Sequence, residues 1–410
     1  MLITATYQSK CMGEQRTLVL IRQILLAGRT LFARPTMGTY LTFCALCLML
    51  TGCWDKVEIE NRSFVSAVGI DAYKDEVENA INFDTPGSLN RFVATAAMPG
   101  QGDGDSGTTL TSVADSLMPA LAMIRLGTSQ EPYYGQTKVI VLGEDLLSDP
   151  KLTAQAIDAM ERNSEISRKV MILSCEGDAS EILQADMEGT QLGIYIADFY
   201  ADKRTALAVA FKKDLELILR DIRRADSTVI PRVAVNDGVV RLSGAALVNE
   251  FELTGWLDDA EVRGLMLAKG AGKNAYITAD FGGVRVPLRV ASNRARLKFS
   301  RDERGLVCTL SVQAKGSVEE YRANSDNDIS SPENISHLNA LFASAIESEI
   351  SATHARLAES GVDALGMIDR LRKFNYSLYE EFVIHQGLGF EDITFVPVAE
   401  VHVTDVGATR

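Results

Sequence analysis

An apolar run that ends at a Gly-Cys pair divides this chain into a leader and a remainder that must carry the fold. Residues 40–50 are apolar except for one threonine, and Thr51, Gly52 and Cys53 follow directly. An apolar run of about eleven residues is too short to cross a bilayer, which needs ~20. Its length and the small residues behind it are typical of a secretory signal peptide. We therefore expect cleavage before Cys53.

Cys53 predicts how the mature chain is attached to the membrane. A cysteine that comes first after the cut offers its thiol for a diacylglyceryl thioether. Each methylene of an acyl chain buried in the bilayer contributes ~0.8 kcal/mol to membrane binding, and stable anchoring takes more than one chain. A diacylated cysteine provides two. We expect a domain anchored by lipid on the outer face of the cytoplasmic membrane. The other interpretation is a buried helix that happens to end in Gly-Cys.

The leader is longer than an ordinary signal peptide. Thirty-six residues precede Met37, and they include a second apolar stretch at 17–32. Either translation begins further downstream, or an additional amphipathic segment lies on the cytoplasmic side. Residues 1–52 are therefore assigned to leader and signal peptide, and the fold is sought in the remaining 358 residues.

The net charge limits the binding partners of the remaining chain, and its cysteine content limits the disulfides it can form. The leader holds five Lys/Arg and one acidic residue, so 36 basic and 54 acidic residues remain, a net charge near −18. This argues against nucleic acid and against direct contact with an anionic bilayer. Outside the leader and Cys53, only Cys175 and Cys308 remain, both in apolar strand-like runs. Two buried thiols are expected rather than a disulfide framework.

Strand and helix patterns predict a multi-domain α+β fold, with mixed and antiparallel sheets flanked by helices. In the first part we expect strands at 64–71, 91–98, 137–142 and 169–174, and helices at 110–124 and 152–162. Further on, Asp258 and Asp259 are placed to cap a short helix. Apolar and polar residues then alternate with period two, which predicts antiparallel strands. Ser331 and Pro332 open an amphipathic helix whose stripe runs from Ile335 to Leu357.

These patterns suggest five segments. They are a leader with signal peptide (1–52), an N-terminal mixed α/β domain (53–200), a linking helix (201–226), a central β-rich domain (227–290) and a C-terminal α+β domain (291–410).

Several motifs in order resemble one family. Trp54, Asp55 and Glu58 follow Cys53 directly, and a Gly-Ile-Asp strand follows at 69–71. The stretch 133–144 is similar to the family's Tyr-Phe-Gly-His-x-Lys strand, with Gln136 in place of the histidine. The blocks around Gly244, Trp256 and Glu261, and the helix segment at 362–366, complete the series. Together these resemble the Ger(x)C lipoproteins, the C subunits of spore germinant receptors, over essentially all of 50–410.

The resemblance implies a function and partners. It implies a lipid-anchored, non-catalytic subunit of a nutrient receptor needed for spore germination, in the spore inner membrane beside integral-membrane receptor subunits. Germinant recognition would lie mainly with those membrane partners. The alternative is an extracytoplasmic solute-binding or cell-wall-acting lipoprotein.

The motif residues also have physical interpretations. Trp54 fits either the membrane interface or a packed position under the first domain. Gly69 and Gly135 are expected to allow close backbone approach or a positive φ. Trp256 and Glu261 are expected to fix a junction between sheet and helix rather than to bind a ligand.

The sequence offers no pattern for catalysis, metal or cofactor binding. All four histidines lie in the last quarter, without zinc-ligand spacing, and no Gly-x-Ser-x-Gly motif occurs. The loop from Asp103 lacks the glutamate that a calcium loop needs at its twelfth position. The charges at 161–165 and 220–224 are interpreted as solvated helix faces. We therefore expect no enzyme activity and no bound cofactor.

Overall fold

The computed structural model describes residues 61–74, 77, 79–82, 89, 91–100, 107–185, 191–201, 208–303, 305–319, 329 and 331–406. All of them belong to one unit, Asn61–Arg410. The signal peptide and the lipidation site at Cys53 lie outside the described residues, as do Trp54, Asp55 and Glu58. No helix among the described segments has the length and apolar character needed to span a bilayer.

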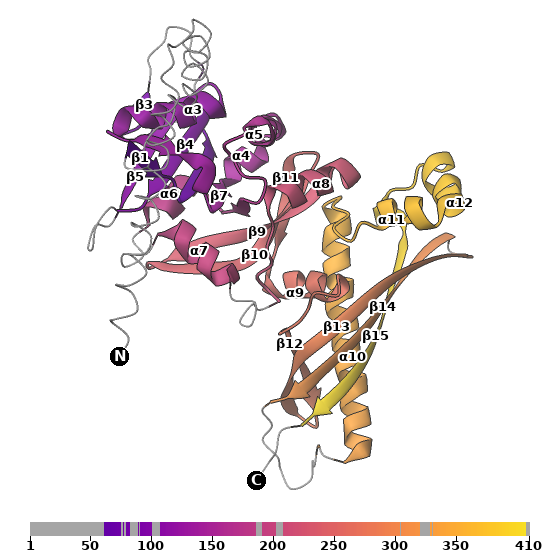
Figure 1. The fold of residues 1–410 in the computed structure, drawn as a ribbon. Helices are drawn as coiled ribbons and strands as arrows, with labels where there is room; N and C mark the ends of the chain where they lie inside the picture. Colours follow the sequence, from indigo (N-terminus) through magenta and orange to yellow (C-terminus); the bar gives the residue numbers. More distant parts are fainter. Residues whose placement is uncertain are drawn as a thin grey trace, which may run out of the picture. The chain divides into compact units, whose positions relative to one another are not determined.

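A nine-stranded mixed sheet organises the first part of this unit (Figure 1). Its order is β11-β10-β9-β8-β7-β2-β4-β5-β3. Strands β2, β7, β8 and β9 pair in parallel, whereas β2–β4–β5 and β9–β10–β11 pair antiparallel. The strands are β2 (Ala67–Ala72), β3 (Ile81–Asn82), β4 (Phe92–Met98), β5 (Thr108–Ala114), β7 (Val139–Leu142), β8 (Met171–Ser174), β9 (Ser227–Asn236), β10 (Val239–Asn249) and β11 (Glu252–Leu257). A separate two-stranded sheet joins β1 (Arg62–Phe64) and β6 (Glu131–Tyr133).

Helices cover both faces of this sheet. In β7, Ile140 and Leu142 belong to one core cluster, whereas Val139 and Val141 belong to another. Such alternation with burial on both sides is typical of parallel strands. The helices of this part are α3 (Leu117–Met123), α4 (Glu144–Ser148), α5 (Pro150–Arg162), α6 (Ala179–Gln184), α7 (Leu192–Ala201) and α8 (Leu215–Ala225), with 3₁₀ turns η2 (Ile124–Gly127) and η3 (Tyr134–Gln136).

Two helix predictions in this part are wrong. The segment 110–124 divides into the end of β5 and α3, because its threonine-rich start pairs with β4, where Thr95 and Thr111 share a hydrogen bond of 3.0 Å. The linking helix expected over 201–226 begins later than expected, because residues 208–213 are not helical and α8 starts at Leu215. Asp214 caps α8 by accepting from the Leu217 amide at 2.9 Å.

A four-stranded sheet, β12-β13-β14-β15, organises the second part. Helix α10 (Pro332–Glu359) buries Leu338, Phe342, Ile346 and Ile350 in the same core cluster as this sheet. Ser331 caps α10 and Pro332 occupies its first turn, as the sequence predicts. The elements are α9 (Asp259–Ala268), β12 (Tyr276–Phe281), β13 (Val284–Asp302), β14 (Gly305–Val318), α11 (Met367–Phe374), α12 (Tyr376–Leu378), the π-helical turn η4 (Tyr379–His385), η5 (Phe390–Asp392) and β15 (Thr394–Asp405).

The sheets divide the chain differently from the predicted central domain over 227–290. Strands β9, β10 and β11 extend the first sheet, whereas β12 and β13 belong to the second. Strand β13 runs without interruption through residue 290. The cause is long-range pairing, because β9 meets β8 at Arg232 and Ser174, far apart in sequence.

A close crossing of α9 and α10 connects β11 to the second sheet. Arg263 donates two hydrogen bonds to the Glu349 carboxylate, at 2.9 and 2.7 Å, and Thr353 Oγ1 donates to the Glu261 carbonyl at 3.0 Å. At Gly264 a Cβ would lie 2.9 Å from the Glu349 carbonyl oxygen and would overlap Thr353 Oγ1. The crossing therefore requires a residue without a side chain at this position.

Gly264→Val should therefore destabilise the protein. Overpacking costs typically about 1–3 kcal/mol, and here a backbone carbonyl blocks relaxation. Ala260→Val, on the exposed side of the same helix, should cost well under about 1 kcal/mol, since only helix propensity changes. Urea denaturation of both variants measures the difference. Equal loss in the two variants would contradict a tight crossing at Gly264.

Candidate functional site

The Gly-Ile-Asp motif of β2 seats helix α6 on the sheet. The buried Asp71 carboxylate accepts hydrogen bonds from the amides of Ala179 at 2.6 Å and Ser180 at 3.0 Å, at the first turn of α6. A Cβ at Gly69 would lie 3.2 Å from the Ala179 backbone. Gly69 thus permits close backbone approach, as predicted, and Asp71 satisfies amides that the helix leaves free.

Asp71 is a carboxyl group in a dry position. Burial is the main cause that raises its pKa to about 7, and the two amide hydrogen bonds oppose this rise. Gly143 leaves the space that the carboxylate needs, because a Cβ there would overlap Oδ1 of Asp71. The motif residue thus acts on packing rather than on solvent or a ligand.

Gly135 and Gly244 serve two different requirements. Gly135 lies in η3, where a Cβ would lie 2.5 Å from the hydroxyl oxygen of Tyr133, so the close approach is to a side chain, and neither the backbone approach nor the positive φ expected for Gly135 is found. Gly244 has φ +79° at a bulge in β10, and a Cβ there would overlap the Leu257 carbonyl oxygen. Only Gly244 needs the left-handed conformation that favours glycine.

Trp256 and Glu261 flank the turn from β11 into α9. The half-buried Trp256 packs against the first core, and the Arg232 guanidinium lies 5.5 Å from its ring centroid. Glu261 forms a capping box with Asp258, with both hydrogen bonds at 2.8 Å. Both residues therefore hold a junction between sheet and helix, as their sequence positions suggest.

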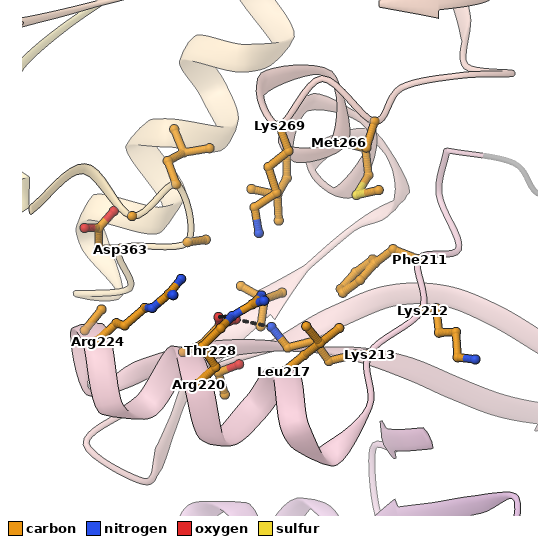
Figure 2. Close-up of a pocket in the computed structure, with 18 of the residues that line it drawn as sticks. Phe211, Lys212, Lys213, Leu217, Arg220, Arg224, Thr228, Met266, Lys269 and Asp363 are labelled. Atoms are coloured by element: carbon orange, nitrogen blue, oxygen red, sulfur yellow. Dashed lines mark hydrogen bonds and ion pairs between the residues drawn. The ribbon is translucent and has the colours of Figure 1, made fainter. Parts of the chain in front are cut away.

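A cavity of about 930 Å³ lies where α8 and β9 face α9 and the loop before α11 (Figure 2). Eight Lys or Arg residues and three Asp residues line it, although the whole chain has 41 basic and 55 acidic residues. Apolar groups such as Phe211, Leu217 and Met266 supply part of its wall. This is a cationic cavity in an acidic protein, and its volume suits a small molecule.

The three aspartates of the cavity already have partners. Asp221 of α8 pairs with Lys213, which lies just before the start of this helix. Asp369 accepts from Arg372 at 2.9 Å and from Lys373 at 2.6 Å. Asp363 accepts from the amides of Met367 at 2.9 Å and Ile368 at 3.0 Å, and so caps α11.

Lys269, at the C-terminal end of α9, points into the cavity toward α8 (Figure 2). The part of the chain that the structure describes places no carboxylate within ion-pair distance of its ammonium group. Lys269 as a whole stays exposed to the open cavity, but the protein packed around its ammonium group partly desolvates it, and this desolvation, with the positive charge of Lys213, lowers its pKa to about 8. Arg220 adds to the decrease, whereas Asp221 and Asp363 oppose it.

The cavity includes residues that the sequence interpretation missed. Arg220 and Arg224 are exposed, as expected for a solvated helix face, and what the sequence does not show is that this face also lines the cavity. Their spacing of four places them on one face of α8 with Lys213 and Leu217 near its start, which is the signal the sequence contains. Lys269 carries no such local signal, because its role depends on the meeting of α9 with α8.

Other chemistry has little support among the described residues. No group of three or more His, Cys, Asp or Glu is placed to hold a metal ion there. Cys175 and Cys308 are free and buried, as predicted, and burial raises the pKa of both thiols. His354 stacks on Phe395 with centroids 4.0 Å apart, and burial lowers its pKa to about 4.

The pKa of Asp71 predicts a pH-dependent contribution to stability. Because its folded pKa lies above the usual 3.8, the folded state gains stability from the neutral form at low pH and loses it as pH rises from about 4 to 7. In Asp71→Asn this dependence disappears. As pH rises from about 4 to 7, the unfolding free energy of the wild type should therefore fall relative to that of the variant, by up to ~1.4 kcal/mol per pH unit.

Urea titrations at several pH values across this window measure the difference. Asp198→Asn, at an exposed position on α7, serves as control and should follow the wild-type profile through pH 5–7, because it replaces no buried carboxyl group. A constant difference for Asp71→Asn would contradict a raised pKa.

Comparisons with known proteins identify the family. A family model described as "Spore germination protein N-terminal domain" matches residues 55–235, and one described as "Spore germination B3/ GerAC like, C-terminal" matches residues 243–407. The crystal structure of the GerBC protein shares the fold, with a TM-score of 0.51 at 15% identity over 76% of this chain and 93% of that one.

Relatives from Bacillus subtilis (strain 168) agree. Spore germination protein YndF is 24% identical over 254 residues, 57% of this chain and 63% of that protein. Putative spore germination protein YfkR is 22% identical over 340 residues, which are 79% of this chain and 85% of that protein. Spore germination protein KC is 20% identical over 354 residues, which are 80% of this chain and 85% of that protein. The chain therefore belongs to the Ger(x)C family of spore germination proteins and has a role related to germination.

Proposed function

We propose that this chain is a lipid-anchored, non-catalytic subunit of a membrane receptor complex that responds to nutrients during spore germination. The observation that carries the proposal is the match of both family domains behind a signal-like run that ends at Cys53. Integral-membrane receptor subunits are the proposed partners, and the outer face of the spore inner membrane is the proposed location.

The described fold supports a structural rather than a chemical role for the family motifs. Gly69, Asp71, Gly244 and Glu261 each fix a close approach, a bulge or a helix start. Such positions fix the internal packing of the domain. The motif residues thus support a binding subunit with a rigid scaffold better than an enzyme.

The anchor gives this role a physical mechanism. Two acyl chains at Cys53 would confine the domain to a thin layer beside its membrane partners. Confinement raises the effective concentration, so a modest contact can be saturated without high affinity. The net charge near −18 of residues 53–410 would keep the domain itself off an anionic bilayer surface.

Cys53→Ala should leave a folded protein that is released from the membrane, and germination should weaken, because the thioether cannot form. Fractionation with a carbonate wash, followed by a germination assay, measures both effects. Cys47→Ala, within the apolar run, is the matched control and should remain membrane-bound. Retention of Cys53→Ala after the wash, or an intact leader on the native protein by mass spectrometry, would refute the lipid anchor.

A further inference from the structure

The cationic cavity has more positive charge than its own carboxylates can balance. Its eight basic residues exceed its three aspartates by five. The C-terminal ends of α8, α9 and α11 border it, and each carries roughly half a negative charge, which offsets about 1.5 of the five. A clear positive surplus therefore remains.

The surplus is concentrated at the centre of the cavity. Lys269 points from α9 toward α8, and Arg220 and Arg224 point toward it from α8 (Figure 2). Lys213 lies in the same wall, 5% exposed, and its pair with Asp221 fixes its position. Cationic groups from two elements that face one another across a cavity repel one another unless an anion lies between them.

The available carboxylates cannot supply this anion. Asp363 holds the first turn of α11. Asp369 is held by Arg372 and Lys373 and lies 4.0 Å from Arg224, and Asp221 is held by Lys213 and lies 3.6 Å from Arg220, so both arginines have only a long ion pair of their own. Moving any of them toward Lys269 would break hydrogen bonds that the fold uses. No carboxylate among the described residues therefore neutralises Lys269, whose ammonium group remains open to an anion that enters the cavity.

We propose that this cavity binds a small organic anion with two or more carboxylate or phosphate groups, held between Lys269 and the arginines of α8. The neighbouring Phe211, Leu217 and Met266 provide an apolar wall for the carbon skeleton of such a ligand. Arginines suit carboxylate and phosphate oxygens because their donors form a planar fork. The proposal concerns the cavity alone and does not depend on the lipid anchor or on receptor membership.

The pKa of Lys269 is consistent with this site. At about 8 the group is partly charged near neutral pH, and a bound anion would raise this pKa by stabilising the ammonium form. Lys213, Arg220, Asp221 and Asp363 are the charged groups that act on Lys269 from the surrounding elements. Binding should therefore take up protons in a weakly alkaline buffer.

Isothermal titration of the full-length chain in detergent tests the proposal. The probes are citrate for carboxylates and pyrophosphate for phosphates, with acetate as a monovalent control at equal ionic strength. Saturable binding of one molecule per chain is expected for citrate or pyrophosphate, and the stronger of the two identifies the anionic group. Acetate should bind at least about tenfold more weakly, because it pairs with one cation only.

Lys269→Met and Arg220→Met should each weaken binding by about tenfold or more, since each removes one charge-assisted hydrogen bond. Lys298→Met is the matched control, because Lys298 is exposed on β13 and does not line the cavity. Circular dichroism verifies that each variant is folded. Absence of saturable binding by both multivalent probes, or an equal loss in Lys298→Met, would overturn the proposal.

Discussion

The crossing of α9 and α10 is the contact on which the arrangement of the described unit depends. It brings two backbones together at Gly264, and the Arg263–Glu349 pair closes the contact at its edge. Because α9 follows β11 directly, the crossing connects the edge of the nine-stranded sheet to the core of the second sheet. It also sets the direction of the C-terminal end of α9, and therefore the place of Lys269 opposite α8.

Sequence reasoning was accurate where the determinants are local. The start of α10 follows from Ser331 and Pro332, and the start of α9 follows from Asp258, one of the two aspartates expected to cap it. These signals act within one helical turn, so no knowledge of distant residues is needed. The buried stripe of α10 was predictable for the same reason, since period 3.6 marks one helix face.

Sequence reasoning failed where pairing with a distant partner decides the outcome. The start of 110–124 has both helix and strand features, and its pairing with β4 selects the strand. Strands β9–β11 belong to the nine-stranded sheet because β9 pairs in parallel with β8, from which the whole α6–α8 segment separates it in sequence. The cavity is the most extreme case, because Tyr200 and Phe374 both line it although 174 residues separate them.

The use of aspartates explains how an acidic chain acquires a cationic cavity. Side chains of Asp71, Asp149, Asp214, Asp258 and Asp363 accept from amides at the starts of α6, α5, α8, α9 and α11. Each is placed where a helix dipole favours negative charge, whereas Arg224 and Lys373 lie near the opposite ends of their helices. The same preference that distributes acids to helix starts places Arg224, Lys269 and Lys373 at the ends of three helices, whereas Lys212 and Lys213 come before α8 begins. Helix directions therefore account for part of the basic lining of the cavity, and the remainder comes from the segment that leads into α8.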